Sequence, residues 1–230
     1  MPETDSYSPT PRTTPTRGRE RASYDRALVH SILDEGYLCH LGFVRDGAPF
    51  VLPTLYARVG ERLYLHGSTG QRPARAAASG GLPVCVTVTH VDGIVLAKSA
   101  FHHSMNYRSV VVHGTATPVT DPAERALGFD ATVDQAVPGR AADCRPASRK
   151  ESAATALLAL DLAEVSAKVR TGGPNEDPAD AGLPYWNGVL PVRTVYGPPL
   201  AVGDPRITGA NWDTAGDAEA PAYLTAYARR

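Results

Sequence analysis

The sequence predicts a mainly β protein, a small antiparallel β-barrel of about six strands with helices at its periphery. Short runs rich in β-branched and aromatic residues are separated by Gly, Asp and Pro turn signals. The runs follow one another closely enough for hairpin connections, which makes the sheet a meander. An open meander has two exposed edges, and closure into a barrel removes them.

The composition favours a globular protein with its own core. Of 230 residues, 43% are apolar, and 23 Lys and Arg nearly cancel 24 Asp and Glu. This balance favours neither nucleic acid nor an anionic membrane as a partner. The three cysteines lack CxxC spacing, which argues against a disulfide framework or a zinc ribbon. With neither a signal-peptide core nor a membrane-spanning run visible, we expect a cytoplasmic protein.

The chain is expected to divide into three parts. Residues 1–22 are rich in Pro, Thr and Arg and have little to bury, so we expect a disordered tail there. Residues 23–203 are expected to form the barrel domain. Residues 204–230 are then a C-terminal extension.

Capping residues predict where the first and last helices of the barrel domain begin. Ser23 is expected to cap a first helix that ends at Gly36. Asp121, followed by Pro122 and Glu124, has the capping-box arrangement for a later helix.

The predicted strands lie between these helices and beyond them. Asp92-Gly93 suits a two-residue type I′ hairpin, because both central residues of that turn need positive φ. The β runs are residues 37–44, 50–59, 62–67, two runs around Asp92-Gly93 within 83–101, residues 107–119 and residues 155–170.

The stretch LHGSTGQRPAR, residues 65–75, leaves a strand and enters a helix. Backbone N–H groups of the turn, the hydroxyls of Ser68 and Thr69 and the guanidinium of Arg72 could converge on a phosphate. An ordinary helix cap with Arg72 and Arg75 in solvent explains the same residues. The GxxxxGK[ST] pattern of an ATP-binding loop is absent.

Other chemistry-bearing residues give weaker signals. His102 and His103 are adjacent, so in a strand they point to opposite faces and do not bind one metal ion together. Neither HExxH nor GxSxG is present, which leaves zinc-protease and serine-hydrolase chemistry without support. Lys168 and Arg170 are either solvent-facing charges or part of a binding face. Trp186 is either a core plug or a lid over an aromatic ligand.

Together these stretches form an ordered set. From Tyr24 to about Val202 the chain resembles the pyridoxamine 5′-phosphate oxidase-like superfamily of FMN-binding split barrels, in particular its nitroimidazole-resistance-like and flavin-nucleotide-binding branch. The resemblance implies a homodimer of six-stranded split barrels with FMN in each of two clefts at the subunit interface. The motifs that carry it are FVLPTLYARVGERLYLHGSTGQRPAR, PVCVTVTHVDGIVLAKSAFHHSMNYRSVVVHGTA, EVSAKVRTGGP and WNGVLPV.

The resemblance also assigns roles to residues. The flavin contacts that it implies are Val51, Leu52, Pro53 and Thr54 along the isoalloxazine ring; Ser68, Thr69 and Arg72 at the phosphate, helped by Lys98 and Ser99; Asn106, Tyr107, Arg108 and Ser109 from the other subunit; Trp186 near the ring; and Lys168 or Arg170 as additional positive charge.

A flavin-dependent oxidoreductase acting on a small organic substrate is the leading functional hypothesis. His66 is the candidate for proton donation or substrate contact, with a structural histidine as the alternative. The vitamin oxidases carry Ser-Arg-Lys where this chain has Gln71-Arg72-Pro73, and this C-terminus lacks their Trp, Arg-Leu and Glu-Phe-Trp signature, which speaks against pyridoxamine phosphate oxidation. A flavin-binding protein without turnover, or a split barrel using deazaflavin or haem, remains open.

Overall fold

The computed structural model describes residues 5–78, 80–200 and 221–227. The chain divides into two units, residues 1–192 and 193–230, and the second contains α5 (Ala222–Tyr227). The predicted boundary at residue 203 and residues 204–220 of the predicted extension lie outside the described residues. The elements of the first unit are η1 (Arg19–Arg21), β1 (Ala22–Ser23), α1 (Arg26–Glu35), β2 (Leu38–Arg45), β3 (Ala48–Val59), β4 (Arg62–Ser68), α2 (Arg72–Ala77), β5 (Leu82–Leu96), η2 (Ala100–His102), β6 (Ser104–Pro118), α3 (Pro122–Ala136), η3 (Ala141–Asp143), α4 (Arg149–Ala154), β7 (Thr155–Asp161), β8 (Glu164–Arg170), η4 (Pro178–Asp180) and β9 (Gly188–Pro191).

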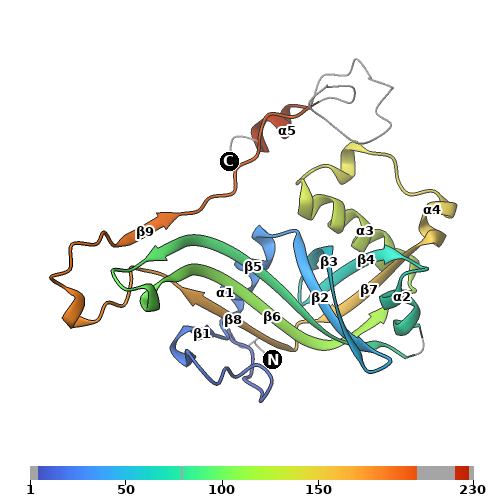
Figure 1. The fold of residues 1–230 in the computed structure, drawn as a ribbon. Coiled ribbons are helices and arrows are strands. Elements are labelled where there is room, and N and C mark those ends of the chain that lie inside the picture. Colours follow the sequence, from blue (N-terminus) through green and yellow to red (C-terminus); the bar gives the residue numbers. More distant parts are fainter. Residues whose placement is uncertain (1–4, 79, 201–220, 228–230) are drawn as a thin grey trace. The chain divides into compact units, whose positions relative to one another are not determined.

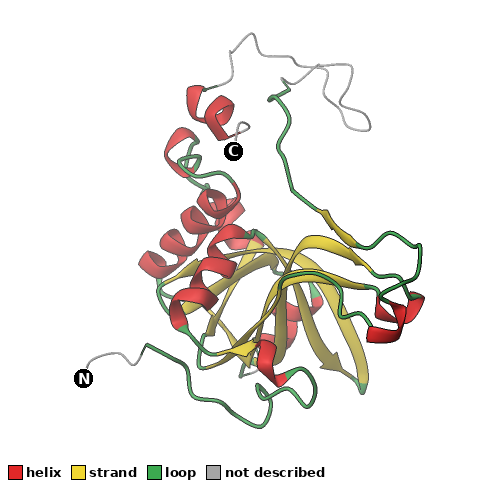
Figure 2. Cartoon of the chain, turned by 90° about the vertical axis from the view of Figure 1, so that its left-hand side faces the viewer, coloured by secondary structure: helices red, strands yellow, loops and turns green. Residues whose placement is uncertain are grey.

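The described strands form one antiparallel sheet in the order β1-β8-β6-β7-β4-β3-β2-β5-β9, and an additional pairing joins β5 to β6. That pairing closes a ring of six strands, β2 to β7, so the predicted barrel class is confirmed. Figure 1 shows β5 and β6 as long neighbouring strands, and Figure 2 shows the helices outside the strands. β1, β8 and β9 extend the sheet beyond the ring.

Turn chemistry explains the first hairpin of the barrel. Asp46 and Gly47 join β2 to β3 with φ of 51° and 75°, which a short Asp-Gly turn tolerates. The second Asp-Gly pair does not form the predicted hairpin, and that prediction is wrong. β5 continues through Asp92, with a bulge between Val91 and Gly93, because β6 pairs with it on both sides.

Gly93 has a different role from the predicted turn. It pairs with Pro191 of β9, and a Cβ at this position would lie 2.8 Å from Val189 Cγ1. The missing side chain therefore lets β9 approach β5. The single run predicted over residues 155–170 is likewise two strands, β7 and β8, joined by a tight turn.

The main core lies inside the ring and is covered by α1. Val29, Ile32 and Leu33 of α1 are fully buried in it. The helix begins two residues later than predicted: Asp25, not Ser23, is its N-cap and accepts a hydrogen bond from Leu28 N at 2.7 Å. Ser23 is instead part of β1, which pairs with β8.

Helix α3 covers a second, smaller core outside the ring. Tyr64, Val119, Leu157 and Ala159 are buried there, with Phe129 of α3 packed against them. Asp121 caps α3 as predicted, accepting from Glu124 N at 2.8 Å.

The reciprocal half of the predicted capping box at α3 is absent. The Glu124 carboxylate instead accepts hydrogen bonds from Arg62 at 2.7 Å and from the Tyr64 hydroxyl at 2.9 Å. These two side chains come from β4, so Glu124 ties α3 to the barrel.

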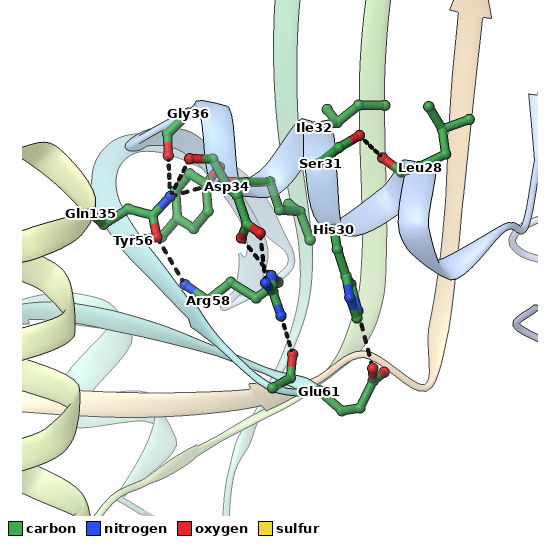
Figure 3. Close-up of polar contacts among 12 residues, drawn as sticks. Leu28, His30, Ser31, Ile32, Asp34, Gly36, Tyr56, Arg58, Glu61 and Gln135 are labelled. Atoms are coloured by element: carbon green, nitrogen blue, oxygen red, sulfur yellow. Dashed lines mark hydrogen bonds and ion pairs between the residues drawn. The ribbon is translucent and has the colours of Figure 1, made fainter. Parts of the chain in front are cut away.

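The side chain of Gln135 joins α3 to the end of α1 (Figure 3). Its amide nitrogen donates to the carbonyl oxygens of Leu33, Asp34 and Gly36 at 3.0, 3.2 and 2.6 Å. These carbonyl groups lie at the C-terminal end of α1, where the helix leaves them without intrahelical partners. Together with the Tyr56 hydroxyl, which donates to Leu33 O at 2.6 Å, this amide caps the end of α1.

The prediction of a disordered tail is wrong for the described part of residues 1–22. Tyr7 is buried in the main core, and its hydroxyl donates to Glu61 at 2.8 Å. Its backbone N donates to Tyr24 O at 2.8 Å. Burial of this one aromatic ring holds the segment against the barrel, and the low apolar content of residues 1–22 does not predict it.

Candidate functional site

A cavity opens where β3 separates from β4. The two strands pair only from Tyr56 to Val59 on β3, so the earlier half of β3 diverges from the end of β4. The cavity there has a volume of about 690 Å³. It is lined by Leu41, Leu52, Pro53, Thr54, Leu55, Leu65, His66, Gly67, Ser68, Gln71, Pro73, Ala74, Ala154, Thr155, Ala156 and Leu158.

Five residues predicted from the sequence share this cavity wall. Leu52, Pro53 and Thr54 come from β3, and His66 and Ser68 come from β4. Thr54 also links the strands, because its hydroxyl donates to His66 O at 3.3 Å. Val51, the next predicted residue along β3, is exposed. The predicted ring and phosphate segments therefore border one space.

The turn from β4 into α2 is held from two sides. Ser68 Oγ accepts from Gly70 N at 3.2 Å, within the turn. Thr69 donates from its backbone N to Ala154 O at 3.0 Å and from its hydroxyl to the same oxygen at 3.3 Å. A Cβ at Gly67 would collide with the side-chain oxygen of Gln71. Only glycine fits there while Gln71 lies across the turn.

Arg72 lies beside the cavity and not in its wall. Its guanidinium carbon is 4.8 Å from the ring centroid of Phe50, and Phe50 stacks on Phe43. Within the described residues Arg72 has no ion pair. A cation held on an aromatic face keeps its donors available for an anion.

Among the described residues that line the first cavity, His66 differs in having a buried side-chain nitrogen without a hydrogen-bond partner. Side chains alternate along β4, so His66 lies on the same face as Tyr64, the face that α3 covers. Its Nδ1 is buried without a hydrogen-bond partner in the described structure. Burial lowers the pKa of the imidazole below its ordinary 6.5. The ring is therefore neutral at neutral pH.

A second cavity system lies on the other side of His66. A small cavity of about 180 Å³ is lined by His66, Phe129, Thr132, Val133, Ala147, Ser152 and Thr155. A larger cavity of about 940 Å³, between α3 and the segment that contains η3 and α4, shares Phe129, Val133, Ala147 and Ser152 with it. The two spaces therefore adjoin, and no pattern in the sequence predicts either of them.

The residues predicted on β6 and β8 lie together but outside the first cavity. Tyr107 pairs with Arg170, and Ser109 pairs with Lys168. Arg170 is buried and donates to Asn106 Oδ1 and to Gly173 O.

Arg108 has partners in its own chain. It forms ion pairs with Glu35 and, at 2.8 Å, with Asp92. The structure therefore groups the β6 and β8 residues with one another, apart from the β3 and β4 residues.

Lys98, Ser99 and Trp186 occupy a third region, around the connection before β9. Lys98 donates from its backbone N to Glu176 at 2.9 Å and from its Nζ to Ala181 O. Ser99 Oγ caps η2. The Trp186 ring is 68% exposed, so it is not the core plug that was one of its two interpretations.

Sequence reasoning missed the far wall of the first cavity. Ala154, Thr155 and Ala156 lie at the junction of α4 and β7, more than 80 residues from Ser68. No local spacing signals that contact. Gln71 was visible as a departure from the vitamin oxidases but not as a wall of the cavity.

The described residues hold no group of three or more His, Cys, Asp or Glu side chains arranged to bind a metal ion. Among those same residues, no helix is long and apolar enough to cross a membrane.

Comparisons with known proteins identify the family to which this closed barrel belongs. Residues 25–169 match the family model for pyridoxamine 5′-phosphate oxidase, and the chain belongs to that flavin-binding split-barrel family. No protein of curated function matches the chain.

Two similar solved structures cover nearly the whole chain. The flavocytochrome Anf3 from Azotobacter vinelandii is 38% identical, with a TM-score of 0.83 over 96% of this chain and 98% of that one. The FAD and heme binding protein from Mycobacterium smegmatis is 37% identical, with a TM-score of 0.81 over 90% and 97%. A putative 5-nitroimidazole antibiotic resistance protein from Bacteroides thetaiotaomicron shares the fold, at 19% identity and a TM-score of 0.54 over 64% and 86%.

Proposed function

We propose that the protein is a flavin-dependent oxidoreductase that carries FAD and a haem. The observation that carries this proposal is the cavity between β3 and β4, which joins the predicted ring and phosphate segments. Two structures similar over at least 90% of the chain are described as a flavocytochrome and as an FAD and heme binding protein. A bound flavin supplies electron transfer that no side chain can perform.

The residues around the cavity suit a flavin nucleotide. Backbone groups of Val51 to Thr54 would bind the polar edge of the ring, since β3 no longer pairs with β4 there. Ser68, Thr69 and Arg72 would bind phosphate oxygens, Arg72 by charge-assisted hydrogen bonds. The apolar wall that includes Leu41, Leu65 and Leu158 would exclude water from one side of the flavin.

FMN without haem is the second candidate cofactor state. The family resemblance favours FMN, which needs only one phosphate site. The two structures at 37–38% identity favour FAD with haem, because similarity at that level covers nearly the whole chain. A flavin carrier without turnover of its own would have the same cofactor content. Only the lack of activity in an enzyme assay would distinguish it from an oxidoreductase.

We also propose a homodimer with composite flavin sites. Large apolar side chains are exposed on β3, β5 and β6, among them Val51, Ile94 and Met105. Ile94 and Met105 pair across β5 and β6, so two of these exposed apolar side chains lie side by side, as at a protein interface. Asn106 to Ser109, which lie outside the cavity of their own chain, would then face the flavin of the partner.

The free state of the three cysteines supports a reducing compartment such as the cytoplasm.

Cofactor content tests the proposal directly. The full chain is purified after expression with added riboflavin and haem precursor, and its visible spectrum is recorded. Acid-released flavin is then identified by mass, and haem by the pyridine haemochrome. FAD with haem supports the proposal, FMN alone supports the second candidate, and absence of both after reconstitution overturns it.

Arg72→Ala, with Arg75→Ala as its matched control, tests the phosphate site. Loss of one charge-assisted contact costs about 1.5–3 kcal/mol, or roughly a 10- to 150-fold weaker flavin nucleotide affinity. Riboflavin, which has no phosphate, should bind both variants and the wild type equally. Equal losses from the two substitutions would place the phosphate elsewhere.

A further inference from the structure

His66 stands in the wall between two spaces. It lines the cavity between β3 and β4, and it also lines the small cavity under α3. Through Phe129, Val133, Ala147 and Ser152 that small cavity continues into the larger one beside α3, which measures about 940 Å³. Cofactor pockets have volumes of roughly 300–1,000 Å³, so the second system has room for a large ligand.

The imidazole of His66 is left without a partner. Its Nδ1 is buried and makes no hydrogen bond in the described structure. A buried polar atom without a partner costs about 1–3 kcal/mol, so such an atom calls for an explanation. A neutral imidazole is the form that binds metal ions.

We infer that His66 is the protein ligand of the iron of a haem, and that this haem occupies the cavity system between α3 and the segment with η3 and α4. This inference rests on the proposed function, because it takes the haem as given. It adds the cavity in which the haem lies and the side chain that binds its iron.

The donor set favours a haem over a free metal ion. A free ion needs three or four protein ligands, and the described residues contain no such cluster. In a haem the porphyrin supplies four nitrogens, so one axial imidazole is enough.

Most of the named wall is apolar: Ala126, Phe129, Val133 and Pro146 would contact the porphyrin faces. Arg145 at the edge is paired with Glu151 at 2.6 Å, so a carboxylate of the ligand would have to share or replace that ion pair.

Cys144 is the alternative protein ligand for the iron. It lines the larger cavity, and it is exposed. Its thiol already contacts Ala141 O at 3.5 Å, whereas the His66 Nδ1 has no contact of this kind. A haem bound through His66 would lie directly behind the wall of the proposed flavin cavity, which suits electron transfer between the two cofactors.

The test is haem titration of the full chain, with the Soret band and electron paramagnetic resonance as readouts. His66→Gly should lower haem affinity at least about tenfold, the lower limit for disturbing even the outer partners of a metal ligand. Added imidazole should restore the wild-type spectrum, because it enters the space left by the side chain. His40→Gly, at an exposed histidine of β2, and Cys144→Ser should both match the wild type.

The outcomes separate the two levels of the proposal. A wild-type protein that binds no haem overturns the proposed haem function together with this inference. A wild-type protein that binds haem, with an unchanged His66→Gly spectrum or with loss confined to Cys144→Ser, overturns this inference alone. If His66→Gly fails to fold, His66→Met serves instead: a retained haem with an altered ligand spectrum supports His66, and an unaltered spectrum contradicts it.

Discussion

Replacing Gln135 by Leu should loosen the contact between α3 and α1. The substitution keeps the approximate shape of the side chain and removes the amide that donates to three carbonyl groups (Figure 3). Leu33 O keeps a partner, since the Tyr56 hydroxyl donates to it at 2.6 Å. Asp34 is exposed, so water can replace the amide there.

The cost should come mainly from Gly36. This residue is buried, and its carbonyl oxygen accepts the shortest of the three bonds, at 2.6 Å. A buried carbonyl left without a donor costs about 1–3 kcal/mol. We therefore expect the free energy of unfolding to fall by about 1–3 kcal/mol.

Urea denaturation followed by circular dichroism measures this change, and hydrogen exchange should show faster exchange at the end of α1. Leu127→Ala is the matched control on the same helix, because Leu127 is 49% exposed. A surface change of that kind should stay within about 0.5 kcal/mol of the wild type. Equal stabilities of Gln135→Leu and Leu127→Ala would refute the assignment of Gln135 as the cap of α1.

Two further predictions concern titratable groups. Burial raises the pKa of the Cys39 thiol to about 12, so a thiol reagent at neutral pH should label exposed Cys144 rapidly and Cys39 only on unfolding. Cys85 is half-buried, so a fast phase that survives the double substitution Cys85→Ser and Cys144→Ser would contradict this. The hydrogen bond from Arg108 lowers the pKa of Glu35 below its ordinary 4.5, against the opposing effect of burial. The stabilisation is therefore present above about pH 4.5 and is lost as the pH falls through the folded-state pKa. The difference in melting temperature between the wild type and Arg108→Met should shrink from about pH 7 to about pH 3, and a constant difference would show that the Glu35 ion pair contributes nothing.

Local patterns in the sequence were sufficient for most of the fold. Alternating apolar runs and turn residues predicted the ring of strands, and Asp46-Gly47 and Asp121 act as their residue types suggest. The failures occurred where a distant element competed with the local signal. Asp92-Gly93 does not turn because β6 and β9 pair across it, and Glu124 turns away from its own helix toward Arg62.

The residues of the candidate site also fall into those that local sequence patterns identify and those that only distant contacts bring together. Its strand and turn residues, Leu52 to Thr54 and Ser68, could be identified from the sequence because each segment is continuous and the family pattern orders them. Tertiary structure alone decided that Ala154 to Ala156 close the cavity and that His66 faces α3. Hydrogen-bond pairing between β4 and β7 brings those segments together, and such pairing over more than 80 residues leaves no spacing signal in the chain.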